Sequence, residues 1–594
     1  MNLSDLIQQT LSEALRSQFD LEIESTELLL QPTKKEFDGF YTFVTFPLAK
    51  SLKQAPAAIA EVLGRYVLDH TDVVSGYNVV QGFLNLSIAD SAWLDTFRLC
   101  QGPDFGQLPP NGQRVMVEYA SPNTNKPLHL GHLRNNFLGY SVAEILKAAG
   151  YTVLKTNVIN NRGVHICKSM LAYQRFGHGQ TPESTGKKGD HLVGEFYVKF
   201  DVEYKAQLEA LKAQGVPDEV AQKEAPLMKE VQQMLIKWEE GDAETRALWT
   251  LMNGWVYAGF EATWQKMGVD FDKIYYESDT YLLGKTVIEQ GLGKGVFYRR
   301  PDGSVWIDLT AEGLDEKLVL RSDGTSVYMT QDLGLADRKY DDFPMQKSIY
   351  VVGNEQDYYF EALFHALQKL ARPYADGLFH LSYGMVDLPS GRMKSREGTV
   401  VDADDLMAEM EETAETMTRE LGKIDGFSVE EATTLYHTLA MGALKYFLLR
   451  VDPKKRMTFN PQESIEFQGN TGPFIQYTHA RLSAILRKAE QMGINPESAP
   501  ETPPTLHPTE RELIFVLGQF PQRLAEAGTQ YSPSLMAQYA YELAKAYNQL
   551  YNEISILGEP DAVNRQFRVL LSGVSAKTIR RSLALLGINA PERM

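Results

Sequence analysis

The segment RVMVEYASPNTNKPLHLGHLRNNFLGYSVAEILKAAGYTVLKTNVIN, residues 114–160, decides the expected fold. Residues 114–120 have the apolar character of a short buried strand, and so do residues 151–160. Between them, apolar side chains recur at helical spacing over residues 138–149, and Gly150 provides a C-terminal stop signal. The order strand, helix, strand predicts a right-handed parallel unit of the α/β class.

Further signals on both sides of this unit outline the domains. Strand patterns return at SIYVVG (348–353) and FHLSYGMV (379–386), while residues 178–250 are polar and helical, which indicates an insertion. The stretch GPDFGQLPPNG (102–112) is rich in Gly and Pro and is typical of a linker. The predicted parts are an N-terminal α+β domain (1–110), a Rossmann-type parallel-sheet domain (111–400) with a helical insertion (around 178–250), a helical connecting segment (401–459) and an all-helical C-terminal domain (460–594).

Composition excludes several classes of protein. With 594 residues, 43% hydrophobic and 23% charged, the chain is neither disordered nor fibrous. No apolar run reaches the roughly 18 residues of a membrane span, and the N-terminus does not resemble a targeting peptide. The two cysteines, Cys100 and Cys167, exclude a disulfide scaffold and a Cys-rich zinc site, so we expect no structural zinc and a cytoplasmic location.

The charge is large but unevenly distributed. A net charge of −18 argues, for the chain as a whole, against nucleic acid as a partner. Residues 401–420 hold eight carboxylates against one arginine, whereas residues 565–594 hold six cations against Glu592 alone. The total charge therefore says little about the local potential at any one surface.

The motif KPLHLGHLRNN, residues 126–136, lies where the first strand gives way to the helix. The N-terminus of a helix favours anions, and neutral histidines such as His129 and His132 can donate hydrogen bonds to phosphate oxygens. Gly131 between them allows a ligand to approach the backbone closely. An ordinary helix cap with two surface histidines would also explain the four residues HLGH.

A second motif, SGRMKSREGT (390–399), places three cations among five residues between two glycines after a predicted strand. Cations on such a loop can stabilise charge that develops on a phosphate leaving group. Taken alone, a solvated basic turn explains this segment better.

Together the two motifs resemble the two signatures of class I aminoacyl-tRNA synthetases, with an insertion between them. Five further stretches make the resemblance specific for the arginyl-tRNA synthetases and extend it over essentially the whole chain. They are EYASPNTNKPLHLGH (118–132), LRSDGTSVYMTQDLGLADR (320–338), YVVGNEQDYYF (350–360), GNTGPFIQYTHAR (469–481) and LLGINAPERM (585–594).

The resemblance assigns residues to the phosphates of ATP. The residues are Lys126, His129, Gly131, His132, Arg392, Met393, Lys394, Ser395 and Arg396. The second signature lacks the second lysine of the family motif, as in many arginyl enzymes that carry a lysine just before the first motif. Lys126 has that position here, so the resemblance gives it the phosphate role and leaves the role of Lys394 open.

The resemblance also implies a pocket for arginine, formed by Glu118, Asn123, Tyr328, Asp332 and Gln356. Tyr328 and Asp332, four residues apart on one helical face, would grip the guanidinium, which calls for acceptors and negative charge. Asn123 and Gln356 would orient the α-amino and carboxylate groups, and Glu118 would add negative charge. Core packing for Tyr328 and a surface position for Asp332 are the ordinary alternatives.

The reaction implied has two steps. The carboxylate of L-arginine attacks the α-phosphate of ATP, which binds with Mg²⁺, and the 2′-hydroxyl of the terminal adenosine of tRNA(Arg) then attacks the acyl carbon. Residues 460–594 would be the anticodon-binding domain. The candidate tRNA-binding residues are Tyr477, Arg481, Arg487, Lys488, Tyr547, Arg580 and Arg581. Residues 1–110 resemble the family's N-terminal domain, which contacts the tRNA elbow, although they hold 14 acids against 7 bases.

The resemblance further implies a monomer without membrane contact. Two rivals stay open at this point. A glutamyl-, glutaminyl- or class I lysyl-tRNA synthetase would share the signatures, but an enzyme for an acidic substrate would need cations at Glu118 and Asp332. A non-catalytic tRNA-binding paralogue would be expected to lose the histidine pair or the pocket acids, and this chain has both.

Overall fold

The computed structural model describes residues 3–34, 36–387, 389, 401–422 and 424–594. Its centre is a five-stranded sheet in the order β12-β11-β5-β6-β7, and every pair of neighbours in it is parallel. The strands are β5 (Arg114–Glu118), β6 (Thr152–Ile159), β7 (Lys273–Tyr276), β11 (Lys347–Gly353) and β12 (Leu378–Tyr383). The α/β class and the parallel unit around residues 114–160 are thereby confirmed.

Helix α5 (Leu130–Ala148) makes the connection between β5 and β6. Its buried face includes Leu133, Phe137, Val142 and Leu146, which pack in the main hydrophobic core. The helix ends before Gly150, whose φ of +88° suits glycine and closes the helix as the sequence predicts.

The strand order indicates where a ligand would bind, which is beside β5. From β5 the chain runs outward through β6 to β7, then returns to the other side of β5 as β11 and β12. In open parallel sheets, ligands bind outside the carboxyl ends of the strands where the order reverses. This switch point lies between β5 and β11, and β5 leads directly into the HLGH motif.

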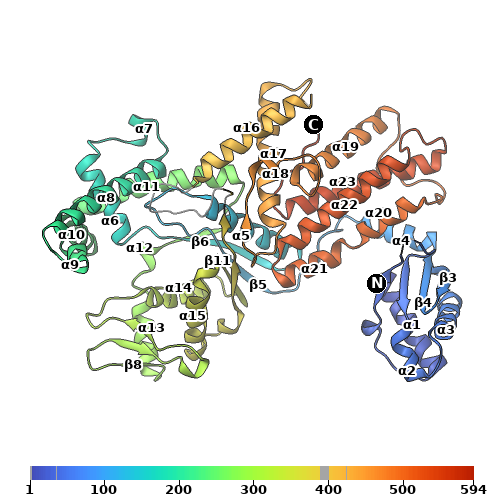
Figure 1. Cartoon of the computed structure of the whole chain (residues 1–594), viewed down its shortest axis with the longest axis horizontal. Coiled ribbons are helices and arrows are strands. Elements are labelled where there is room, and N and C mark those ends of the chain that lie inside the picture. Colours follow the sequence, from blue (N-terminus) through green and yellow to red (C-terminus); the bar gives the residue numbers. More distant parts are fainter. Residues whose placement is uncertain (1–2, 35, 388, 390–400, 423) are drawn as a thin grey trace.

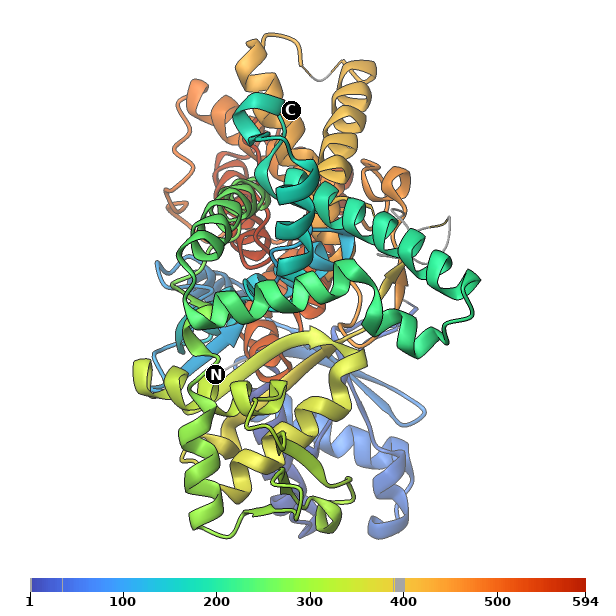
Figure 2. The ribbon, with the colours of Figure 1, turned by 90° about the vertical axis from the view of Figure 1, so that its left-hand side faces the viewer.

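Two excursions leave the sheet, one between β6 and β7 in the chain and the other between β7 and β11. Figure 1 labels helices of both. The first is all helical and larger than the predicted insertion, because everything between β6 and β7 belongs to it. Its helices are α6 (Val164–Phe176), α7 (Pro182–Thr185), α8 (Gly189–Ala213), α9 (Asp218–Glu224), α10 (Pro226–Glu240) and α11 (Ala243–Met267). Figure 2 views the molecule from the side of this insertion.

The second excursion was not predicted. It comprises α12 (Glu277–Thr280), α13 (Gly284–Gly293), an antiparallel sheet of β8 (Phe297–Arg299), β9 (Val305–Ile307) and β10 (Lys317–Leu320), and α14 (Tyr328–Asp342). Strands of three or four residues are too short to show alternation. The turn signals Pro301-Asp302-Gly303 and Ser322-Asp323-Gly324 were available in the sequence.

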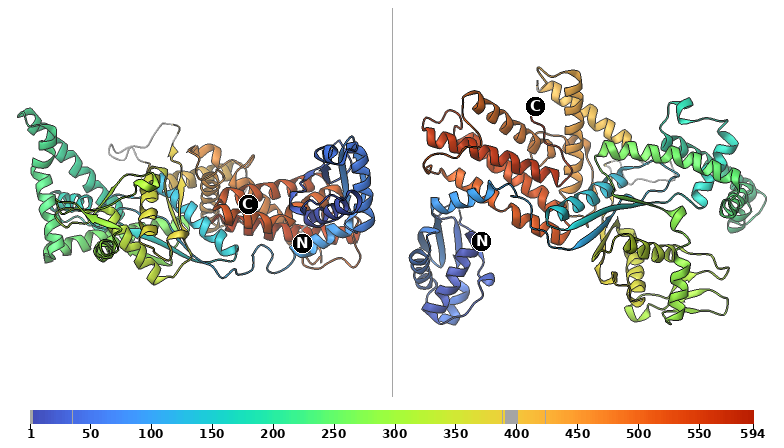
Figure 3. Two further views of the ribbon diagram at one scale, coloured as in Figure 1. Left: turned by 90° about the horizontal axis from the view of Figure 1, so that it is seen from below. Right: turned by 180° about the vertical axis from the view of Figure 1, so that it is seen from behind.

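The N-terminal domain forms one end of the molecule and the helical insertion the other (Figure 3). The domain contains an antiparallel sheet in the order β1-β2-β4-β3, with helices against it. Its elements are α1 (Leu3–Phe19), β1 (Leu30–Pro32), β2 (Tyr41–Val44), α2 (Ala49–Leu52), α3 (Pro56–His70), β3 (Val74–Val80), β4 (Phe83–Ile88) and α4 (Asp90–Cys100). It contacts the C-terminal helices through an ion pair of Asp90 with Arg511 at 2.8 Å and an edge-to-face contact of Phe40 with Phe515.

The C-terminal third is nearly all helical, as predicted. Its elements are α16 (Ala403–Glu420), α17 (Val429–Leu449), α18 (Pro461–Ser464), α19 (Gly472–Gln491), α20 (Pro508–Gly518), α21 (Phe520–Gln530), α22 (Pro533–Glu553) and α23 (Ala562–Ala584). Helices α17 and α19 approach closely, since a Cβ at Gly472 would lie 2.3 Å from the carbonyl oxygen of Gly442. The segments before and after the expected boundary near residue 460 are therefore packed against each other. Among the described residues, no helix is long and apolar enough to cross a bilayer.

Candidate active site

The histidine pair begins helix α5. His129 is the N-cap, and its Nδ1 accepts a hydrogen bond from the backbone N–H of Gly131 at 3.1 Å. The Nδ1 of His132 accepts from the backbone N–H of His129, also at 3.1 Å. A Cβ at position 131 would lie 3.0 Å from the His129 ring, which is a tight contact, so glycine suits this position of the ring.

These bonds fix the tautomer of both rings. Because each Nδ1 accepts a hydrogen bond, the proton of each neutral imidazole is on Nε2. Burial lowers the pKa of His129 to about 4, and burial and the neighbouring His129 lower the pKa of His132 as well. Both histidines are thus neutral near pH 7, with Nε2–H groups that can donate to an anion at the positive end of the helix.

Lys126 lies close enough to the pair to influence it. Its positive charge contributes to the lowered pKa of both His129 and His132, and burial lowers its own pKa. A partly desolvated cation beside two N–H donors is the arrangement expected for neutralising phosphate oxygens.

The chain that follows the second signature returns to the first. The N–H of Leu130 donates to the carbonyl of Val401 at 3.1 Å, and the N–H of Ala403 donates to the carbonyl of Leu128 at 3.0 Å. His129 and Asp402 are therefore bridged in antiparallel fashion. The signature residues Arg392, Met393, Lys394, Ser395 and Arg396 lie outside the described residues.

The helical insertion contacts the segment that follows the second signature through a cluster of charged side chains. Lys188, next to α8, donates to Asp404 at 2.6 Å and to the fully buried Asp190 at 3.1 Å. His191 lies 3.2 Å from Asp404 and 3.3 Å from Asp402, and these carboxylates raise its pKa. Asp190, His191 and Asp404 have the spacing of metal ligands, but the ammonium group of Lys188 already bonds two of them.

The expected arginine residues gather at the switch point of the sheet, with one change of role. Glu118 ends β5 and is buried in an ion pair with Lys339 of α14. Because Lys339 pairs with it, Glu118 adds less negative charge to the site than an unpaired carboxylate would. It instead anchors α14, the helix that carries Tyr328 and Asp332, against the sheet.

Asp332 is the principal anionic candidate of the pocket. It accepts a hydrogen bond from the hydroxyl of Tyr359 in α15 (Asp357–Lys369), and burial raises its pKa to about 6. No cation forms an ion pair with it within the described part of the chain. Tyr328 begins the same helix and is 76% exposed, so its ring does not belong to the core.

Glu277, which was not among the residues predicted from the sequence, belongs to the same group. It follows β7, and burial raises its pKa to about 7, with a further contribution from the charge of Asp332. No motif marks this glutamate, since only the parallel pairing of β7 with β6 brings it to the carboxyl end of the sheet. Two carboxyl groups with raised pKa values near each other indicate a place for a cationic ligand.

Two polar residues, Asn123 and Gln356, lie at the edge of the candidate arginine pocket, which we call its rim. Asn123 follows β5 and pairs with Asn160 at the end of β6, and Gln356 follows β11, so both lie at the carboxyl ends of strands. Both residues are exposed. Behind them, Asn135 of α5 accepts from the N–H of Ala120 at 2.6 Å and donates to the carbonyl of Val351 at 2.7 Å, which fixes α5 between the two strands.

The expected tRNA-binding residues divide into exposed and buried ones. The guanidinium of Arg481 lies 5.0 Å from the ring centre of Tyr477 and 4.7 Å from that of Tyr551, which is 42% exposed. Tyr547, one turn before Tyr551, is fully buried and its hydroxyl lies 3.0 Å from that of Ser572. It has no face on which a base could stack, so Tyr551 takes its place among the candidates.

The other candidate cations lie at the surface, and the three arginines among them have partners. Arg487 donates to the carbonyl of Glu592 at 3.0 Å, and Arg580 pairs with the Glu592 carboxylate. Arg581 donates to the carbonyl of Pro103 at 2.9 Å and so ties α23 to the linker after the N-terminal domain. Lys488 is exposed.

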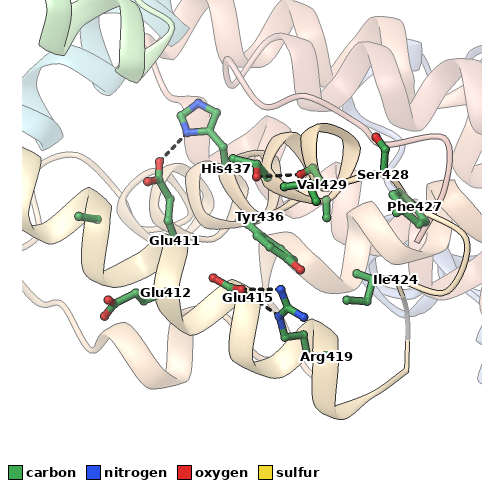
Figure 4. A pocket seen from close by; sticks show the side chains of 13 residues that line it. Glu411, Glu412, Glu415, Arg419, Ile424, Phe427, Ser428, Val429, Tyr436 and His437 are labelled. Carbon is green, nitrogen blue, oxygen red and sulfur yellow. Dashed lines mark hydrogen bonds and ion pairs between the residues drawn. The ribbon is translucent and has the colours of Figure 1, made fainter.

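A cavity of about 720 Å³ lies between α16 and α17 (Figure 4). Its walls include Glu411, Glu412, Glu415 and the apolar side chains of Phe427 and Val429. All of its lining comes from residues 408–437, and none comes from the sheet or α5. The cavity is therefore separate from the site at the switch point.

Comparison with known families agrees with this arrangement. The family model described as "tRNA synthetases class I (R), catalytic domain" matches residues 98–460. The "DALR anticodon binding domain" matches residues 475–594, and the "Arginyl tRNA synthetase N terminal domain" matches residues 1–88. The fold, the histidine pair and these matches define a class I aminoacyl-tRNA synthetase.

Individual relatives show which family within this class of synthetases the chain belongs to. The chain is 59% identical to the arginine–tRNA ligase of Amoebophilus asiaticus, with complete coverage of both chains, and 54% identical to that of Parabacteroides distasonis, with 98% coverage of both. The structure of the Thermus thermophilus arginyl-tRNA synthetase superimposes with a TM-score of 0.78 at 26% identity over the full length of both. The chain belongs to the arginyl-tRNA synthetase family, which confirms the resemblance seen in its sequence.

Proposed function

We propose that this chain joins L-arginine to tRNA(Arg) at the expense of ATP. The observation that carries the proposal is the pair of carboxyl groups of Asp332 and Glu277, whose pKa values are raised at the switch point of the sheet. A guanidinium is charged at every relevant pH and would pair with these carboxyl groups, neither of which forms an ion pair with a cation among the described residues. A substrate with an acidic side chain would add a third negative charge there.

In the first step the arginine carboxylate attacks the α-phosphorus of ATP, and pyrophosphate leaves. The substrate supplies its own nucleophile, so the protein has to align the reactants and neutralise the charge that develops on the phosphates. The Nε2–H groups of His129 and His132 and the ammonium group of Lys126 suit that task. Mg²⁺ would enter as part of the nucleotide, and we assign it no protein ligand.

In the second step the 2′-hydroxyl of the terminal adenosine of the tRNA attacks the acyl carbon of arginyl-adenylate. The ester C–O bond forms, the mixed anhydride breaks and AMP leaves with the phosphate oxygen. No side chain need become acylated, because the adenylate already carries a good leaving group.

Selection of arginine would rest on geometry as well as charge. Asp332 can accept two parallel hydrogen bonds from the guanidinium while it retains the bond from Tyr359. Tyr328 would cover the exposed side of the group, and Asn123 and Gln356 would hold the α-amino and carboxylate groups at the rim.

Binding of tRNA would involve the C-terminal helices and the N-terminal domain. Arg481, Arg487 and Lys488 along α19 would contact phosphates, with Tyr477 and Tyr551 available for unpaired bases. We further propose that the enzyme acts as a monomer in the cytoplasm, where ATP, arginine and tRNA are present together.

The test is a charging assay with purified enzyme, ATP, Mg²⁺, labelled arginine and tRNA(Arg). We expect acid-precipitable arginyl-tRNA that is released by mild base, as an ester should be. The double variant His129→Ala/His132→Ala should lose charging while still binding arginine. Absence of charging by the folded wild-type enzyme would refute the proposal.

A further inference from the structure

The last ten residues of the chain, 585–594, are held firmly against other parts of the molecule. Helix α23 ends at Ala584, and Gly587 then reverses the chain with a φ of +67°. Leu586 and Ile588 are 1% and 3% exposed. Terminal residues are ordered in this way only where they are tied down. We call residues 585–594 the C-terminal strap.

Alternate carbonyl groups of the strap are bonded to buried side chains of other helices. In each case a hydroxyl, ammonium, amide or imidazole N–H group donates to a backbone oxygen. The pairs are Ser141 with Leu585 (2.7 Å), Lys445 with Gly587, Gln476 with Asn589 (2.8 Å) and His479 with Pro591 (2.9 Å). All four donor side chains are buried, so water does not substitute for these bonds.

The donors connect two regions with different tasks. Ser141 lies on α5, which begins at the histidine pair, whereas Gln476 and His479 lie on α19, which carries the candidate tRNA-binding residues. Lys445, on α17, stands between them. The strap therefore links the helix of the phosphate site to a helix of the anticodon-binding domain through consecutive hydrogen bonds.

Lys445 is the unusual member of this series. It is 4% exposed, its ammonium lies 5.4 Å from the ring centre of Phe137 on α5, and no carboxylate pairs with it among the described residues. Burial lowers its pKa to about 8. A Cβ at Gly587 or at Gly268, which follows α11, would lie 3.4 Å from Nζ, so three separate segments meet at this amine.

Stability alone does not account for a lysine at this position. A buried cation without a carboxylate partner is unfavourable, and an apolar residue of the same length would fill the space without that penalty. What the ammonium adds is a directed bond to the Gly587 carbonyl. That bond joins α17 to the strap, next to the bond that Ser141 of α5 makes to Leu585.

We propose that Lys445 is a positioning residue for the charging reaction. By holding the Gly587 carbonyl it fixes the C-terminal strap, and through it the tRNA-binding helix α19, relative to the histidine pair at the start of α5. The inference rests on the proposed function and adds a residue outside the proposed sites for ATP, arginine and tRNA. It predicts that loss of the bond slows charging without weakening the binding of tRNA or arginine.

The experiment uses the full-length enzyme and three variants. Lys445→Met removes the donor and keeps the length of the side chain, whereas Lys445→Gln retains an uncharged N–H donor. Lys229→Met, on α10 with a half-exposed side chain, is the matched control. The readouts are the rate constant of single-turnover charging with enzyme in excess over tRNA, the Kd for tRNA from filter binding, and the KM for arginine. A single-turnover rate constant does not depend on the fraction of enzyme that is active.

We expect Lys445→Met to lower the charging rate constant at least tenfold, with the Kd for tRNA and the KM for arginine within twofold of wild type. Lys445→Gln should recover the rate to within threefold, and Lys229→Met should match wild type. A Lys445→Met rate constant within twofold of wild type would overturn the inference. So would a loss of rate that is matched by an equal loss of tRNA affinity.

A second variant keeps the inference testable if Lys445→Met does not fold. Ser141→Ala removes the neighbouring bond to the Leu585 carbonyl and leaves only a small space. It should lower the rate constant several-fold at unchanged Kd, and an unchanged rate constant would overturn the inference. Failure of the proposed function itself would look different, because the wild-type enzyme would then form no arginyl-tRNA.

Discussion

The use of arginine should depend steeply on pH because of two carboxyl groups. Burial raises the pKa of Asp332 to about 6 and that of Glu277 to about 7, so both lose their charge as the pH falls through the range from 8 to 5. The guanidinium of arginine remains charged throughout this range. Binding should therefore weaken toward acidic pH and reach its full strength above pH 8.

The size of the effect follows from the ionised fractions. If arginine requires both carboxylates, the doubly ionised fraction falls from about 0.7 at pH 7.5 to below about 0.01 at pH 5.5, a loss of about 100-fold in kcat/KM. If only Asp332 matters, its ionised fraction falls from nearly one to about 0.25, a loss of about fourfold. The two cases differ enough to be separated.

The assay is the initial rate of charging at limiting arginine, with ATP and tRNA saturating, between pH 5.5 and 8.5. The rate at saturating arginine is the control for effects of pH on chemistry and on tRNA. Glu277→Gln should remove the steeper part of the profile and leave the fourfold change, since Asp332 would then be the one titrating carboxyl group of the pair.

A flat profile of kcat/KM for arginine from pH 5.5 to 8.5 would refute this reasoning. So would a profile in Glu277→Gln that is as steep as that of the wild type, because Glu277 would then have no part in binding the substrate.

Three further predictions concern single residues. Asp332→Asn should keep the fold, since an amide oxygen can still accept a hydrogen bond from Tyr359, but it should weaken the use of arginine by about 3–5 kcal/mol. The control Asp341→Asn, at an exposed position of α14, should change the use of arginine little. Wild-type steady-state constants for Asp332→Asn would remove this residue from the pocket. Lys126→Ala should slow adenylate formation by about 10²–10³ with little change in arginine binding, and pre-steady-state kinetics in which Lys394→Ala is far worse would reverse the assignment. Lys488→Glu should raise the KM for tRNA and reduce the slope of log KM against log salt by about one unit, with no change in the KM for arginine; an unchanged slope would mean that Lys488 contacts no phosphate.

Much of the catalytic core could be predicted from the sequence because local patterns determine it. The run from Arg114 to Ile159 has apolar strands, a helical period and a glycine stop, and the structure places β5, α5 and β6 there. The histidine pair also follows from local features, since a helix N-terminus is defined within a few residues. The short strands β8 to β10 are too brief for periodicity, although their Asp-Gly turns were visible.

The details of the pocket depended on contacts between distant segments. Glu118 was expected to add negative charge to the arginine pocket, but Lys339, 221 positions away, is its partner. Tyr547 and Tyr551 are tyrosines one turn apart on α22, and nothing in the neighbouring sequence distinguishes them. Tyr547 is buried where α22 packs against α23, whereas Tyr551 is exposed. Glu277 carries no motif at all. These properties arise from the fold rather than from the neighbouring sequence.

The central claim is that the pocket around Asp332 selects arginine. The most direct measurement is amino-acid-dependent exchange of labelled pyrophosphate into ATP, with each of the twenty amino acids in turn, in the presence and absence of tRNA(Arg). We expect exchange with arginine alone, and the family resemblance predicts that this exchange requires tRNA. Exchange with glutamate, glutamine or lysine at a rate comparable to that with arginine would contradict the account.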